Sequence, residues 1–334
     1  MIKTGIYGIF RIVLLFRDIP GWWGWTLLIL GLVSGIMGVL LAISQHDLKR
    51  LLAYHSIENI GIILIGLGAG LLGLSYGMSS LALLGLAGAL LHVINHGLFK
   101  GLLFLSGGAV IRATHTRNMS EYGGLLRAMP LTGFFFLGGA VAICGLPPLN
   151  GFVSEWLIYL GLFNGGLPAS GLPGLLPAVA GLALIGGLAL LCFTKVFGLC
   201  FLGGPRPKWQ GVAEAPGGML AAMAILLAAC FGIGLAPLGM LPLLSAALRQ
   251  VVSIPHEGAA LTVLAPAGWI SFAALLMFLL LGLPAAPALF RRRQPIPSST
   301  TWGCGYGSPL PRARYTPSSF AETIMLLFRW GLRT

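Results

Sequence analysis

The sequence predicts an all-α membrane protein, a polytopic bundle of about eight transmembrane helices. The 334 residues are 57% hydrophobic and 8% charged, which leaves too few charges to cover a soluble domain of this size. Apolar runs of about 20 residues, the length that a helix needs to cross a bilayer, recur along the chain. No short alternating strand pattern occurs, and backbone groups in lipid must be satisfied within their own segment, so helices are favoured over a barrel.

Two of the predicted spans depart from a plain apolar helix. One is about 34 residues long, roughly 50 Å if straight, so it must tilt, bend or protrude. Another is broken by residues 144–151 (CGLPPLNG), because two prolines with flanking glycines do not sustain a helix. Broken helices at membrane depth occur where protein or water surrounds the freed backbone, often at transport sites. The eight predicted spans are 2–16, 22–44, 51–72, 78–111 (the long one), 131–163 (the broken one), 175–202, 219–241 and 261–289.

Basic residues gather on one side of the predicted bundle. This positive-inside bias predicts that this side, and the C-terminal tail with it, is cytoplasmic. The net charge of +12 is therefore explained by topology and does not indicate nucleic-acid binding. We interpret the loop charges, with Asp47 and Glu121 among them, as solvated. If connections alternate, the basic side holds Lys49, Arg50, Arg112, Arg117, Arg127, Arg206, Lys208 and Arg291 to Arg293, and the other side holds mainly Arg17 and Arg249.

The chain divides into three parts, residues 1–202, 203–289 and 290–334. The first two hold the spans, and the third is a Pro/Arg/Ser/Gly-rich basic loop with a short amphipathic helix. Ser319 and Glu322 form a capping box for that helix, and apolar residues follow at helical spacing.

A row of ionisable residues lies inside the predicted membrane region. His92, His96 and Lys100 are spaced by four, so they share one helical stripe, about 6 Å apart per step. Charges at mid-bilayer cost at least ~2.5 kcal/mol, so such residues need an explanation. Histidine titrates near neutrality and a desolvated lysine releases its proton more easily, so the row is suited to passing protons. The alternative is three buried polar groups satisfied by neighbouring helices.

Five further residues are candidates for the same path. Glu155 follows the Pro-Pro break and is either a proton site near the exit or a helix-pairing ion pair. Lys3, taken alone, is a snorkelling terminal lysine. His55, Glu58 and Lys195 are either a charge set that pairs helices or a side entry for protons.

Other chemistries are excluded by spacing. Four of the five cysteines fall in apolar helices and none forms a CxxC or Cys/His ligand pattern, so neither zinc nor iron–sulfur binding is supported. No phosphate-binding loop, metalloprotease or hydrolase motif occurs. The cysteines are Cys144, Cys192, Cys200, Cys230 and, in the tail, Cys304.

Four segments resemble the proton-translocating membrane subunits of respiratory complex I, multisubunit cation/proton antiporters and energy-converting hydrogenases. They are residues 2–8 (IKTGIYG), 47–56 (DLKRLLAYHS), 92–100 (HVINHGLFK) and 145–152 (GLPPLNGF), in that order. Within this superfamily, residues 55–61, 301–306 and 314–316 are most similar to the hydrogenase-4 component B and formate hydrogenlyase membrane subunits.

The resemblance implies a role for each residue. Lys3 would be the connecting lysine of the central axis, Lys100 the middle lysine of the second half-channel and Glu155 the terminal acid, with His92 and His96 as relays. Residues 1–202 would be the second of two inverted repeats. Because the first repeat is missing, we expect a fragment or a split gene product.

The resemblance also implies the setting. The chain would be a proton-conducting subunit of an oxidoreductase complex in the cell inner membrane, without an active site or cofactor of its own. Other membrane subunits and a peripheral redox arm carrying [NiFe] and iron–sulfur centres would be its partners. Two rival hypotheses are a cation/proton antiporter subunit and a structural subunit that translocates nothing.

Overall fold

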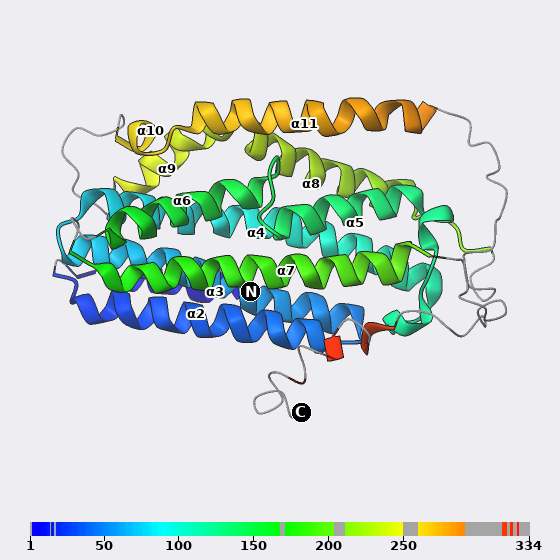
Figure 1. The fold of residues 1–334 in the computed structure, drawn as a ribbon, viewed down its shortest axis with the longest axis horizontal. Helices are drawn as coiled ribbons and strands as arrows, with labels where there is room; N and C mark the ends of the chain where they lie inside the picture. The colour runs from blue at the N-terminus through cyan, green and yellow to red at the C-terminus, as the bar shows by residue number, and fades with distance from the viewer. Residues whose placement is uncertain are drawn as a thin grey trace, which may run out of the picture.

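The structure, a computed structural model, is a bundle of helices lying along one common direction (Figure 1). It describes residues 2–13, 15–16, 18–167, 171–203, 211–249, 260–290, 316–318, 321–322 and 326. Within these residues the regular elements are all helices, and the extended pairing is an isolated bridge between Asp47 and Asn118. The predicted all-α fold is confirmed.

The first four helices build the centre of the bundle. They are α1 (Ile2–Val13), α2 (Gly21–Ser44), α3 (Leu48–Ser75) and α4 (Ser79–Thr114). Helices α2 to α4 lie side by side along the bundle, and the chain's N-terminus lies near its middle (Figure 1). The predicted long span is one unbroken helix of 36 residues, and it packs against α3, α5, α6, α8 and α9.

The predicted break is present. Helix α5 (Pro130–Ile143) ends just before it and α6 (Asn150–Gly166) begins just after it, and the two lie roughly end to end (Figure 1). Protein surrounds the interruption, because a Cβ at Gly234 of a later helix would lie 2.8 Å from the backbone carbon of Leu149. The short helices η1 (Met119–Glu121) and η2 (Leu125–Arg127) precede α5.

The last helices differ from the predicted spans at prolines. The span predicted to reach residue 241 ends at Leu235, because Pro237 lacks a backbone N–H and starts a new 3-10 turn. The span predicted over 261–289 is interrupted at Pro266 for the same reason. The elements are η4 (Pro173–Leu175), α7 (Leu176–Phe201), α8 (Gly217–Leu235), η6 (Pro237–Met240), α9 (Leu241–Leu248), α10 (Ala260–Leu264) and α11 (Ala267–Phe290).

Five of the described helices are long and apolar enough to cross a membrane: α2, α3, α4, α7 with its η4 turn, and α8. Shorter apolar helices, α5 among them, accompany these five. Helix α1 has 12 residues, fewer than the ~20 that a crossing needs. The chain is a multi-pass bundle, and the total of eight spans stays a prediction.

Glycines bring α2 and α3 into backbone contact. A Cβ at Gly31 would lie 2.7 Å from the carbonyl oxygen of Gly61, and one at Gly38 would lie 2.6 Å from the backbone nitrogen of Glu58. Small residues at an interface let membrane helices approach closely. This contact also seals Glu58 away from the outside of the bundle.

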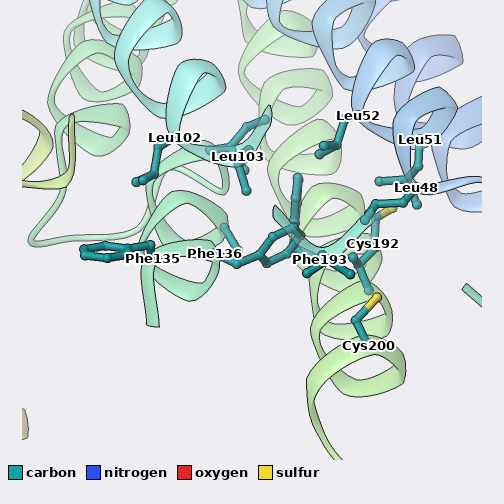
Figure 2. Packing of buried hydrophobic residues seen from close by; sticks show 14 of the residues in the cluster. Leu48, Leu51, Leu52, Leu102, Leu103, Phe135, Phe136, Cys192, Phe193 and Cys200 are labelled. Carbon is teal, nitrogen blue, oxygen red and sulfur yellow. The ribbon is translucent and has the colours of Figure 1, made fainter. Parts of the chain in front are cut away.

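Near one end of the bundle, α3, α4, α5 and α7 share a hydrophobic core. Leu52, Leu103, Phe136 and Phe193 converge from these four helices (Figure 2). Each of the four is 2% exposed or less. The core fixes how the four helices face one another, and therefore which side chains point inward.

The helix ends and connections beside this core hold five of the predicted basic residues. Lys49, Arg50, Arg112, Arg117 and Arg127 are all exposed there, as predicted for solvated loop charges.

Asp47 has a structural role at the same end, because its carboxylate accepts from the backbone N–H of Arg50 and caps α3.

The connection between α4 and α5 holds a buried phenol, Tyr122. Its hydroxyl donates to the carbonyl oxygen of Thr116 at 2.6 Å, and burial raises the pKa of this phenol well above its usual range. Some predictions concern residues that the structure does not describe. These residues are Arg17, Arg206, Lys208, Arg291 to Arg293, Cys304 and most of the helix predicted to begin at residue 319.

Candidate functional site

Ionisable side chains lie inside the bundle. Seven of the eight predicted site residues are 7% exposed or less, and Lys3 is partly buried. Isolated charges in such surroundings are costly, so each needs hydrogen bonds or a compensating charge. The seven are His55, Glu58, His92, His96, Lys100, Glu155 and Lys195.

The predicted stripe on α4 faces the interior. His92 is 0%, His96 3% and Lys100 7% exposed, because α4 is enclosed by its neighbours over this part of its length. Neighbouring helices, not lipid, therefore supply the surroundings of all three side chains.

His92 joins α3 to α6. Its Nε2 lies 3.1 Å from Oδ1 of Asn59 on α3, and its Nδ1 lies 2.9 Å from Oγ of Ser154 on α6. Both ring nitrogens therefore have polar partners, which offsets the desolvation of a fully buried imidazole.

The hydrogen bonds continue to the broken helix. Asn95 donates to the carbonyl oxygen of Asn150 at 2.7 Å and to Oγ of Ser154 at 3.0 Å. Asn150, the first residue of α6, donates back to Oδ1 of Asn95 at 3.1 Å. The start of α6 is thus tied to α4 beside His92.

On α3, the predicted pair His55 and Glu58 is a direct contact. Nδ1 of His55 is hydrogen-bonded to Oε2 of Glu58, and both residues are 0% exposed. Nδ2 of Asn59 lies 2.8 Å from the carbonyl oxygen of His55 and 3.5 Å from Oε2 of Glu58. Asn59 therefore stands between this pair and His92.

Lys100 faces α3 instead of the next residue of its own stripe. Its ammonium donates to the carbonyl oxygen of Leu52 and lies 5.4 Å from the ring centroid of Phe104. Leu52 lies on the helix that carries Glu58, six positions before it. The buried base of α4 therefore contacts the helix that carries the His55 and Glu58 pair.

Lys3 reaches the same row from α1. A Cβ at Gly97 would lie 2.7 Å from Nζ of Lys3, so the ammonium lies against α4 one residue beyond His96. Neither ring nitrogen of His96 has a hydrogen-bond partner among the described residues.

Glu155 lies over the break. The carbon of its carboxylate would be 2.7 Å from a Cβ at Gly145, the residue that follows the cap of α5. Ser154, its neighbour in the chain, is the partner of His92. The predicted acid is thus next to the network that begins on α4.

Lys195 lies apart from this network. From α7 its ammonium donates to the carbonyl oxygens of Ile43 at 2.5 Å and Gln45 at 3.2 Å, at the C-terminal end of α2. Positive charge is favourable at that end of a helix. This geometry supports the helix-pairing alternative for Lys195.

Sequence reasoning did not select four polar residues of the network, namely Asn59, Asn95, Asn150 and Ser154. Each lies in an apolar stretch within four residues of a predicted site residue or beside the prolines. Polar residues at such positions were the available signal.

A multi-pass helical bundle with buried acids, lysines and histidines beside a broken helix defines a membrane protein with a polar interior suited to carrying small ions. The family described as "NADH:quinone oxidoreductase/Mrp antiporter, TM" matches residues 1–170. The chain belongs to this family.

Relatives and solved structures agree with this assignment. Formate hydrogenlyase subunit 3 of Escherichia coli is 40% identical over 316 residues, covering 92% of this chain and 50% of that protein. Hydrogenase-4 component B of the same species is 38% identical over 322 residues, covering 92% and 48%. A chain of the membrane-bound sulfane sulfur reductase, an archaeal respiratory membrane complex, superposes with a TM-score of 0.74 and 25% identity, covering 99% and 54%. The chain thus spans about half the length of these relatives.

Proposed function

We propose that this chain carries a proton half-channel of a membrane-bound redox complex of the hydrogenase-4 or formate hydrogenlyase type, or of a complex I-like NADH:quinone oxidoreductase. The observation that carries the proposal is the row of ionisable side chains inside the bundle, with Lys100 bonded to the helix that carries Glu58. The row consists of the partly buried Lys3 and the buried His96, His92 and Glu155. Protonation of Lys100 would alternate as neighbouring charge approaches and withdraws, and displace a proton toward Glu155.

The side entry is the better interpretation of His55 and Glu58. The pair is fully buried, and Oε1 of Glu58 and Nε2 of His55 have no hydrogen-bond partner among the described residues. A carboxylate whose only purpose was to pair helices would be expected to have both oxygens satisfied.

The proposal includes a setting for the chain. Other membrane subunits and a peripheral arm would be the partners, and the [NiFe] and iron–sulfur centres would reside in that arm. The chain would sit in the cell inner membrane with its basic end and residues 290–334 in the cytoplasm. Residues 1–202 would form the half-channel and 203–289 would add lateral helices.

Replacing Lys100 by alanine tests the proposal. Coupled proton movement should be lost, because the buried base that accepts the proton is gone, while the redox activity of the peripheral arm persists. Proton uptake by vesicles carrying the intact complex, normalised to the amount of assembled complex, measures this.

Lys49→Ala is the matched control, since Lys49 is an exposed lysine in the first turn of the neighbouring α3. It should move protons at the wild-type rate. Wild-type proton movement in Lys100→Ala would refute the half-channel.

A cation/proton antiporter subunit remains the second candidate, because the matched family also includes the Mrp antiporter. Proton movement that depends on a sodium gradient and not on electron donors would favour this candidate.

A further inference from the structure

The imidazole of His92 is held between an amide on α3 and a hydroxyl on α6. Nε2 faces Oδ1 of Asn59 at 3.1 Å and Nδ1 faces Oγ of Ser154 at 2.9 Å. In a neutral imidazole one nitrogen donates and the other accepts, so the partners decide which nitrogen keeps the proton.

Asn59 determines whether Nε2 carries a hydrogen. The amide nitrogen of Asn59 lies 2.8 Å from the carbonyl oxygen of His55, an atom that can only accept. The nitrogen of the amide must therefore face that carbonyl, and the amide oxygen must face His92. Because this oxygen also only accepts, Nε2 carries a hydrogen in both protonation states. Nδ1 is then the atom that gains and loses a proton.

Ser154 has one hydroxyl hydrogen and two acceptors for it. Asn95, held by the carbonyl oxygen of Asn150, donates to Oγ at 3.0 Å and occupies one lone pair. The hydroxyl hydrogen is then shared between the carbonyl oxygen of Gly151 at 3.0 Å and, when His92 is neutral, its bare Nδ1. One hydrogen cannot serve both atoms.

Protonation of His92 resolves this competition. Nδ1–H then donates to the second lone pair of Oγ, and the hydroxyl hydrogen is free for Gly151. In the neutral state the hydroxyl turns to Nδ1 and leaves Gly151. The proton that enters stays on Nδ1, and no O–H bond breaks.

We propose that the Ser154 hydroxyl is a two-position switch that transmits the protonation state of His92 to the first turn of α6. The hydroxyl hydrogen binds or leaves the carbonyl oxygen of Gly151. In an α-helix this same carbonyl accepts from the backbone N–H of Glu155, four residues later. Ser154 is thus a positioning residue between the relay on α4 and the acid at the break. The switch rests on the proposed function, because it operates only if His92 changes protonation during proton movement.

Charged groups surround this switch on several helices. The ammonium of Lys3 on α1 lies against Gly97 of α4, and His96 lies one helical turn after His92. The His55 and Glu58 pair lies behind Asn59 on α3, and Glu155 follows Ser154 on α6. A change in any of these charges changes the fraction of His92 that is protonated. The roles of donor and acceptor within the switch are set by Asn59 and Asn95.

Ser154→Ala in the intact complex removes the switch and tests it. The hydroxyl is a charge-assisted partner of protonated His92, so its loss should slow proton movement about tenfold per assembled complex. Ser106→Ala is the matched control: Ser106 is a fully buried serine of α4 whose hydroxyl, among the residues that the structure describes, bonds to Leu102 and Leu103 of its own helix. It should leave proton movement unchanged.

A spectroscopic measurement tests the geometry directly. In the complex labelled with ¹⁵N-histidine, the His92 signals are those missing from His92→Gln. Neutral His92 should show the Nε2–H tautomer in the wild type and in Ser154→Ala. Asn59→Leu should show both tautomers, because the acceptor that holds the hydrogen on Nε2 is gone. An Nδ1–H tautomer in the wild type would overturn the switch.

The two proposals fail separately. Wild-type proton movement in Ser154→Ala, together with its loss in Lys100→Ala, would overturn the switch and leave the half-channel standing. Wild-type movement in both variants would overturn the half-channel.

Discussion

Gly145 and the carboxylate of Glu155 are in contact at the break between α5 and α6. Gly145 has a φ of +62°, a left-handed conformation that a glycine adopts without a Cβ penalty. Its missing side chain also leaves the space that the carboxylate of Glu155 fills. One glycine thus serves both the turn of the chain and the placement of the acid.

Gly145→Ala should therefore damage both stability and proton movement. The left-handed backbone costs an alanine about 1–2 kcal/mol, and the new Cβ displaces the carboxylate. Gly77→Ala is the matched control, with a φ of +67° and nothing within 4 Å of the added Cβ. Both variants should lower the Tm of the detergent-solubilised complex, and only Gly145→Ala should slow proton movement. Equal proton movement in the two variants would show that proton movement does not depend on the position of the Glu155 carboxylate.

At this scale the sequence predicted the identity of the buried ions better than their partners. Lys100 and Glu155 stand out as charges in apolar runs. The contacts of His92, however, join it to residues 33 and 62 positions away. Spacing along one helix carries no information about such partners, because they depend on how the helices face one another.

At the scale of elements, the start of α5 is capped by a residue from another connection. The backbone N–H groups of Leu131 and Thr132 donate to Oε2 of Glu214 at 2.8 and 3.3 Å. The first N–H groups of a helix have no partner within it, and a carboxylate there also meets the positive end of the helix dipole. Glu214 thus links the α7–α8 connection to the helix that precedes the break.

Glu214→Ala should destabilise this end of the bundle by about 1–2 kcal/mol, the usual cost of losing an N-terminal cap. Glu214→Gln keeps one acceptor oxygen and should lose less. Thermal unfolding of the solubilised complex, followed by the assembled fraction, measures both. A Tm equal to that of the wild type in Glu214→Ala would show that water replaces the cap.

Helix boundaries followed the sequence where prolines or long apolar runs dictated them. The break at residues 144–149 was predicted because Pro147 and Pro148 interrupt a helix. The interruptions at Pro237 and Pro266 obey the same rule, although the spans predicted over 219–241 and 261–289 run across both prolines. Continuous hydrophobicity identifies membrane segments, but it does not distinguish one helix from two in line.

At the scale of the whole molecule, charge divides the two ends of the bundle. The exposed basic residues of the α2–α3 and α4–α5 connections lie at one end, and the turn between α3 and α4 lies at the other (Figure 1). By the positive-inside rule we expect the basic end to face the cytoplasm. A proton moving from the Lys100 level to Glu155 and along α6 would then travel away from the cytoplasm.

Accessibility of single cysteines tests this orientation. Ala213, in the connection before α8, and Ser79, at the start of α4, are exposed at opposite ends. In a Cys304→Ser background the cysteines Cys144, Cys192, Cys200 and Cys230 are all buried, so Ala213→Cys and Ser79→Cys add the reactive thiols. A membrane-impermeant maleimide should label Ala213→Cys in inverted vesicles and Ser79→Cys in right-side-out vesicles. The opposite pattern would reverse the direction of the path, because the Lys100 end would then face outward while the contacts among its residues stayed the same.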